Sequence, residues 1–189
     1  GERVLVLGQG VVGLLTASLL NEFPLDKIVT ADHFELRRAA SKGMNNVTAV
    51  NSNREEFQKE SSAYAQGKFD LIFELSGSPS TLNDAISLTC FSGRVVIGSW
   101  YGQKRAEIDL GGTFHRSRIK LISSQVSSIS PELSGRWDKA RRFEVTWDAL
   151  KRIKPEKWIT HHFSIEDAGN AYQLLDENPQ DTIQVVFEY

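Results

Sequence analysis

A Gly-x-Gly-x-x-Gly motif occupies residues 8–13 (GQGVVG). It directly follows the short strand-like run RVLVL at residues 3–7 and opens an apolar stretch, which is the context in which this motif binds a dinucleotide. In such a site the first glycine permits a tight turn, the second lets a pyrophosphate approach the backbone, and the third lets the helix pack against the strand. The free N–H groups at the helix start then hold the phosphates. The sequence therefore predicts a phosphate-binding turn made by Gly8, Gln9, Gly10, Val11, Val12 and Gly13.

The carboxylate of Asp32 is a second group that could bind a dinucleotide. Asp32 ends a predicted strand over residues 27–32, about 20 positions beyond the motif, where an acidic residue accepts hydrogen bonds from the adenosine ribose. Because a 2′-phosphate would meet a negative charge there, Asp32 favours NAD over NADP. Arg37 and Arg38 follow within one helical turn and could soften that preference. The alternative interpretation of Asp32 is a turn residue or a helix cap at the end of a strand.

Small residues follow two later strands. Ser76 and Gly77 come after a predicted strand at 69–75, and Gly98 comes after one at 94–97. Ligands of open α/β sheets bind beyond the carboxyl ends of the strands, so these residues would let a nicotinamide ribose pass close to the backbone. The alternative is that small residues simply make tight turns between strands and helices.

The elements that must position these residues alternate along the chain. Strands are predicted over residues 3–7, 27–32, 47–50, 69–75, 94–97 and 119–123. Helices are predicted over 11–20, 35–42, 54–64, 137–153 and 164–175, with another opening at Ser78-Pro79, and a last strand over 182–187. This alternation is typical of an α/β fold with a doubly wound, six-stranded parallel sheet and helices on both faces.

Two helices carry an apolar stripe that we expect to be buried. In the helix that opens at Ser78-Pro79, the stripe consists of Leu82, Ala85, Ile86 and Thr89. In the helix over 137–153, it consists of Trp137, Ala140, Phe143, Trp147 and Leu150. We expect both tryptophans to belong to the core.

Composition excludes several classes of protein. The 22 Lys and Arg residues nearly balance the 24 Asp and Glu residues, so charge gives no reason to expect nucleic acid or an anionic membrane as the main partner. Cys90 is the only cysteine, which excludes an internal disulfide framework and a Cys-rich zinc module. No apolar run approaches the roughly 18 residues of a membrane span. We expect a cytoplasmic protein, and the absence of an initiating Met fits a piece of a longer chain.

Other residue pairs resemble catalytic or metal-binding motifs only in spacing. Tyr64 and Lys68 have the spacing of a catalytic pair, but Gly67 interrupts the helix between them. The side chains of His161 and His162 diverge on any regular element, so they do not form a ligand pair. The sequence therefore offers no general acid or base and no metal site.

At the level of whole segments, the chain resembles the cofactor-binding domain of medium-chain dehydrogenases of the zinc alcohol dehydrogenase type. It is most similar to the threonine-dehydrogenase-like and bacteriochlorophyllide-dehydrogenase-like members. The segments that carry the resemblance are GERVLVLGQGVVG, TADHFELRR, FDLIFELSGSPSTLNDAISL, SGRVVIGSWYG, FHRSRIKLISSQVSSI and ITHHFSIEDAGNAYQLLDENP.

The resemblance implies a Rossmann domain that binds NAD(H) across Gly8, Gly10, Gly13 and Asp32. Arg37 matches a family position beside the adenosine ribose, and Gly77 and Gly98 match turns near the nicotinamide half. Gln184 departs from the family, because many members carry a basic residue there, near the pyrophosphate.

The resemblance also implies what lies outside this chain. The whole of 1–189 would be the NAD(P)-binding domain, and 158–189 would be a closing segment that returns to a catalytic domain carrying the zinc ligands. The full enzyme would transfer a hydride between an alcohol-type carbon of a small molecule and NAD. It would dimerise through the strand at 119–123. The alternative function is a non-enzymatic, nucleotide-sensing regulatory domain; a methyltransferase fits less well, because it binds no pyrophosphate.

Overall fold

The computed structural model describes residues 1–53, 55, 57, 63 and 68–189. The helix predicted over 54–64 falls largely outside the described residues, as does the Tyr64 of the rejected pair. No helix in the described part of the chain combines the length and the apolar character needed to cross a bilayer.

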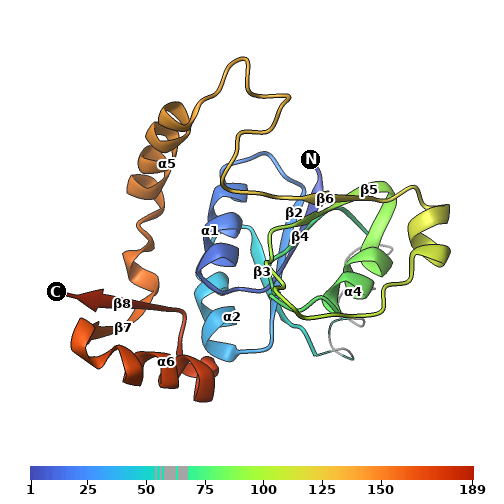
Figure 1. Cartoon of the computed structure of the whole chain (residues 1–189). Helices are drawn as coiled ribbons and strands as arrows, with labels where there is room; N and C mark the ends of the chain where they lie inside the picture. Colours follow the sequence, from blue (N-terminus) through green and yellow to red (C-terminus); the bar gives the residue numbers. More distant parts are fainter. Residues whose placement is uncertain (54, 56, 58–62, 64–67) are drawn as a thin grey trace.

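A six-stranded parallel sheet forms the centre of the molecule (Figure 1). Its strands are β1 (Arg3–Leu7), β2 (Lys27–Asp32), β3 (Val47–Asn51), β4 (Phe69–Glu74), β5 (Thr89–Ile97) and β6 (Lys120–Ser123). They lie in the order β3-β2-β1-β4-β5-β6, so the strand order reverses between β1 and β4. The side chains of Val4, Leu5 and Val6 are fully buried, as expected for a central parallel strand covered on both faces.

Helices cover both faces of this sheet. Figure 1 shows α1 (Val11–Leu20) and α2 (Glu35–Lys42) on one face and α4 (Thr81–Leu88) on the other. The predicted α/β class, the doubly wound arrangement and the six parallel strands are therefore confirmed. Leu82, Ala85 and Ile86 of α4 pack into the buried core against the sheet, as the apolar stripe predicts.

The α4–β5 region differs from the prediction at both ends. Ser78-Pro79 does not open the helix: Thr81 and Leu82 donate backbone hydrogen bonds to the carbonyl groups of Ser78 and Pro79, so the chain makes a tight turn before α4. Thr89 is buried, but as the first residue of β5, and its hydroxyl donates to Ala85 O at 2.7 Å.

The long helix α5 (Lys139–Ile153) corrects our expectation of its buried face. The helix begins at Lys139, two residues later than predicted. Asp138 caps it by accepting a hydrogen bond from the Arg141 N–H. Phe143 and Trp147 are 54% and 62% exposed. The predicted burial of Phe143 and Trp147 was therefore wrong, as was that of Ala140, which is also exposed. The reason is that α5 lies beyond α1, away from the sheet, and packs mainly through its last turns (Figure 1).

Trp137, the other tryptophan expected in the core, precedes α5 and is half-buried. The guanidinium of Arg141 lies over its ring at 4.4 Å from the ring centre. The buried residues of α5 are Ala149 and Ile153, and the latter packs with Leu14 of α1.

The C-terminal segment forms a small sheet of its own. Its elements are η2 (Pro155–Trp158), β7 (Ile159–Ser164), η3 (Ile165–Asp167), α6 (Ala168–Glu177), η4 (Pro179–Asp181) and β8 (Gln184–Glu188). β7 and β8 pair in parallel as a separate two-stranded sheet. The sequence analysis assigned no strand to β7. His161 and His162 lie on it, and neighbouring side chains on a strand point to opposite faces.

Candidate functional site

A cleft of about 360 Å³ opens at the carboxyl edge of the sheet, where β1, β2 and β4 end. The carboxyl ends of parallel strands, at the point where strand order reverses, are where open α/β sheets bind ligands. Five of the predicted site residues line this cleft: Gly8, Gly10, Asp32, Arg37 and Ser76. The residues that sequence reasoning did not select include Phe34, Ser52, Thr81 and Asp84.

The glycine turn has the geometry that the motif predicts. Gly8 has φ +90°, and a Cβ on it would lie 2.6 Å from the Leu75 carbonyl oxygen. A Cβ on Gly13 would lie 1.9 Å from the Gly8 carbonyl oxygen, so only glycine lets α1 pack this closely against the turn. Gly10 differs from both, because a Cβ there would meet no atom within 4 Å.

The open side of Gly10 and the start of α1 together suit an anion. Gly10 is the N-cap residue of α1, and no side chain caps the helix there. A helix start presents backbone N–H groups and the positive end of the helix dipole. The space that a Cβ on Gly10 would fill is thus available for a phosphate group, and the turn fits the diphosphate of a dinucleotide.

Gln9, which sequence reasoning included among the site residues, points away from the cleft. Its side chain is fully buried, donates to Gly8 O at 2.8 Å and accepts from the Ser41 hydroxyl at 2.7 Å. Val11, Val12 and Gly13 are likewise absent from the cleft lining. Gln9 thus attaches the turn to α2, and Gly13 lets α1 pack closely on it. Val11 and Val12 are the first residues of α1.

Asp32 joins the two turns that border the cleft. One carboxylate oxygen accepts from the Gln9 N–H at 2.7 Å, and the other accepts from the Phe34 N–H at 2.9 Å. The residue is only 7% exposed, yet it lines the cleft. Each carboxylate oxygen can accept more than one hydrogen bond, so capacity remains for a ligand hydroxyl. Asp32 therefore fits both interpretations from the sequence, a turn residue and a ribose acceptor.

Arg37 lines the cleft, but its donors turn toward the C-terminal segment. Its Nε donates to Thr182 O and a terminal nitrogen donates to Pro179 O, both at 3.1 Å. Its guanidinium also lies over the Phe34 ring, 4.8 Å from the ring centre.

Arg38 is also engaged. It donates to the backbone oxygens of Asp32 and His33 and forms an ion pair with Glu35. Neither arginine therefore presents an unengaged guanidinium to the cleft.

Hydrogen bonds join the turn after β4 to the turn after β5. The Gly77 N–H donates to the Ser99 hydroxyl at 2.9 Å, and the Gly98 N–H donates to Glu74 O at 3.0 Å. Gly77 has φ +73°, and a Cβ on Gly98 would lie 2.5 Å from a methyl carbon of Leu75. Gly77 and Gly98 adjoin the cleft without lining it, whereas Ser76 lines it.

Glu74 is the residue that sequence reasoning missed. It is fully buried at the end of β4 and accepts hydrogen bonds from the Ser76 N–H at 2.8 Å, from the Ser76 hydroxyl and from the Tyr101 hydroxyl. Burial, followed by the contact with Glu74, raises the pKa of the Tyr101 phenol far above its ordinary value. The only sequence signal was an acidic residue near the end of an otherwise apolar strand.

Metal binding is a different matter. Among residues 1–53, 55, 57, 63 and 68–189, no group of three or more His, Cys, Asp or Glu side chains could hold a metal ion. His162 pairs with Glu188 at 2.8 Å, while His161 stacks with Phe163.

The family model for zinc-binding dehydrogenases matches residues 11–143. The chain belongs to this family. The match covers α1 from Val11 onward, Asp32 and the β4–β5 region, so the cleft-lining residues other than Leu7, Gly8 and Gly10 lie within it.

Relatives of this zinc-binding dehydrogenase chain are about twice its length. The starvation-sensing protein RspB of Escherichia coli K12 is 25% identical over 195 residues, which cover 100% of this chain and 52% of RspB. L-threonine 3-dehydrogenase of Stenotrophomonas maltophilia K279a is 30% identical over 180 residues, covering 94% and 49%. The chain thus spans about half the length of the curated relatives it matches.

Solved structures agree on the fold. An alcohol dehydrogenase, RspB of E. coli CFT073 in complex with NADH, superposes with a TM-score of 0.80 at 24% identity, covering 100% of this chain and 52% of that one. L-idonate 5-dehydrogenase of E. coli K-12 superposes with a TM-score of 0.78 at 24% identity, covering 100% and 50%.

Proposed function

We propose that this chain is the NAD(H)-binding domain of a zinc-type alcohol or polyol dehydrogenase. The observation that carries the proposal is the uncapped start of α1 at Gly10, which faces a cleft bordered by Asp32. Family membership and the NADH complex of a relative with the same fold support it. When bound, the nicotinamide cofactor would carry the hydride to or from the alcohol carbon.

In this proposal, residues of this chain bind the cofactor and orient it. The N–H groups at the start of α1 hold the diphosphate, and Asp32 accepts hydrogen bonds from the adenosine ribose hydroxyls. The engagement of Arg37 and Arg38 with backbone oxygens leaves the negative charge of Asp32 to face the ribose, which favours NAD over NADP. Ser76, Gly77 and Gly98 border the path of the nicotinamide ribose.

The zinc of the proposed enzyme would need ligands from outside this chain. The described residues do not fit a zinc site, and we assign no step through a metal ion to them. We propose that residues 1–189 form the cofactor domain, that 158–189 is the segment returning to a catalytic domain, and that the substrate is a small alcohol bound between the two.

The proposed dimer would form through β6. This strand lies at the edge of the sheet and three of its four residues are exposed, with Ile122 40% exposed. An open edge presents unpaired backbone groups that a second copy could pair with. Size-exclusion chromatography with light scattering tests this: a monomer at the highest concentration would argue against the dimer.

A glycine pair provides the test of cofactor binding. A Cβ on Gly10 or on Gly135 would meet no atom of the protein within 4 Å, so either glycine can become alanine without a clash. We expect titration calorimetry to show NAD⁺ binding in the wild type and in Gly135→Ala. Gly10→Ala should remain folded but lose most of that affinity, because its methyl group occupies the phosphate position. Equal binding by both variants would refute the proposed site.

A further inference from the structure

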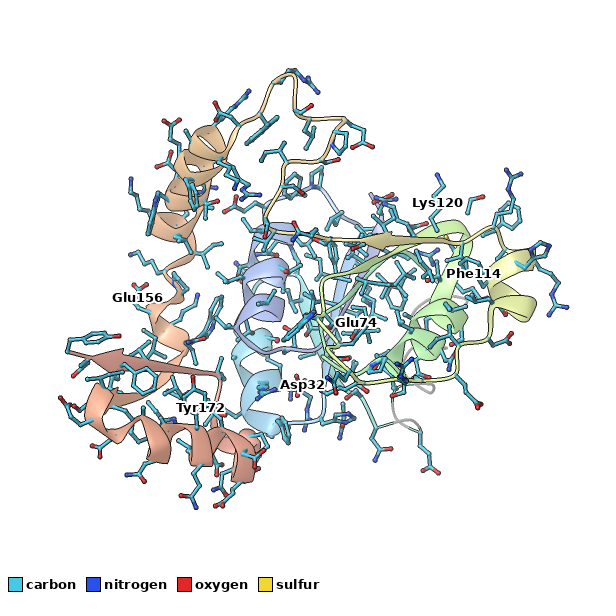
Figure 2. All side chains as sticks on the ribbon, in the orientation of Figure 1. Asp32, Glu74, Phe114, Lys120, Glu156 and Tyr172 are labelled. Carbon is cyan, nitrogen blue, oxygen red and sulfur yellow. The ribbon has the colours of Figure 1, made fainter. Side chains whose placement is uncertain are left out.

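Glu74 places a carboxylate beneath the cleft in the middle of the sheet. It is the last residue of β4, 0% exposed, and lies in register with Leu7 of β1 and Ile97 of β5. Leu7, Leu75 and Ser76 line the cleft, so the carboxylate is one residue away from its wall. Figure 2 labels Glu74 and Asp32, which end their strands at the same edge of the sheet.

The hydrogen bonds of Glu74 come from uncharged groups. Its hydrogen-bonding partners are the Ser76 N–H, the Ser76 hydroxyl and the Tyr101 hydroxyl. Within the described part of the chain, no Lys, Arg or His forms an ion pair with it. Lys104, on the loop that carries Tyr101, donates instead to Gly77 O at 2.9 Å.

The two halves of the sheet would bind the two halves of a dinucleotide. Asp32 on β2 marks the half that receives the adenosine, so the nicotinamide half lies over the ends of β4 and β5. That is the half that contains Glu74. The nicotinamide ring carries a positive charge in NAD⁺ and none in NADH, so a buried negative charge there distinguishes the two forms.

We propose that the buried carboxylate of Glu74 stabilises bound NAD⁺ relative to bound NADH and so sets the preference of this domain between the oxidised and the reduced cofactor. The inference rests on the proposed function, because it needs the cofactor to bind in this cleft. Glu74 acts here as a positioning and electrostatic residue. It exchanges no proton and acts on the cofactor through space, across the Ser76 turn.

The expected size of the effect follows from Coulomb's law. At an effective dielectric constant of about 20, opposite unit charges at separations of about 10 Å change a binding constant roughly tenfold. Loss of the charge should therefore weaken NAD⁺ binding relative to NADH binding by at least about threefold. A purely structural role would weaken both forms by the same factor.

The experiment measures the dissociation constants of NAD⁺ and NADH on the full chain by calorimetry. We expect Glu74→Gln to raise the ratio Kd(NAD⁺)/Kd(NADH) by at least about threefold. Glu74→Asp, which keeps the charge, should retain the wild-type ratio. Glu144→Gln, which removes an exposed charge on α5, is the matched control and should also retain it.

The outcomes distinguish a failure of the proposed function from a failure of this inference. Wild-type protein that binds neither form would overturn the proposed function and this inference with it. Wild-type protein that binds both, with a ratio unchanged in Glu74→Gln or changed equally in Glu74→Asp, would overturn the inference alone. Circular dichroism establishes folding. A Glu74→Gln that unfolds is replaced by Glu74→Leu with Tyr101→Phe, since the second change avoids an orphaned phenol hydroxyl. That double variant is compared with Tyr101→Phe, and an equal ratio in the two would also overturn the inference.

Discussion

The guanidinium of Arg37 donates a hydrogen bond to the carbonyl oxygen of Thr182 at 3.1 Å. A second bond, to Pro179 O at the same distance, makes α2 the anchor of the segment that leads into β8. The residue that borders the cleft is thus also the residue that holds the C-terminal segment in place.

Arg37→Ala should loosen the C-terminal segment. Hydrogen bonds from a charged donor contribute about 1.5–3 kcal/mol each when buried and less at a half-buried site, so we expect about 2 kcal/mol in total. Amide hydrogen exchange should accelerate over residues 179–188 and remain unchanged in β1. Lys42→Ala, an exposed change on the same helix, is the control. Unchanged exchange in Arg37→Ala would mean that the two hydrogen bonds do not hold the segment.

Asp32→Ser should have two effects at once. Removing the charge should raise affinity for NADP relative to NAD, since a 2′-phosphate would no longer meet a carboxylate. The same change leaves the buried N–H of Gln9 and the part-buried N–H of Phe34 without their acceptor, which costs about 2–4 kcal/mol in total.

Titrations with both cofactors and thermal unfolding separate these effects. Asp32→Asn, which keeps one side-chain oxygen, should show the shift in cofactor ratio with a smaller loss of stability. An unaltered NAD/NADP affinity ratio in both variants would remove the ribose role from Asp32.

Gly13→Ala should destabilise the protein, in contrast to Gly10→Ala. Its Cβ would lie 1.9 Å from the Gly8 carbonyl oxygen, so α1 must move away from the turn. Overpacking of this kind costs about 1–3 kcal/mol or more. Urea unfolding measures the difference, and Gly10→Ala should stay within about 1 kcal/mol of the wild type. Equal stability of the two variants would contradict the close packing of α1 on the turn.

Tyr101 should make the protein sensitive to alkali. Its pKa is raised in the folded chain, chiefly by burial and then by Glu74, above the ordinary value of 10.0 that it has when unfolded. The folded state therefore binds more protons above pH 10, so the free energy of unfolding should fall as pH rises beyond that value. Tyr101→Phe should remove this component. The difference in tyrosinate absorbance between the two proteins follows the group directly, and titration at an ordinary pH would contradict it.

The fold was predictable because parallel strands that are buried on both faces leave continuous apolar runs. β1 and β2 were located within their observed bounds for this reason, and the spacing of the glycines located the turn between β1 and α1. The start of α4 was misplaced because Ser78 and Pro79 suit a tight turn as well as a helix start.

Periodicity could not identify which face of α5 packs. Trp147 and Ile153 lie on different faces, and only the position of α1 decides that Ile153 is buried. Within the site, Asp32 was recognisable by its place at a strand end. Glu74 was not, because its hydrogen bond with the Tyr101 hydroxyl joins the end of β4 to a loop distant in the sequence. The orientation of Gln9 toward Ser41 is likewise a long-range contact that spacing does not encode.

The carboxylate that would recognise the ribose is also the one that closes the two backbone turns around the cleft. Cofactor choice and local architecture thus share a single side chain. A substitution of Asp32 that shifts cofactor choice must also keep a neutral acceptor for the N–H groups of Gln9 and Phe34, as asparagine would.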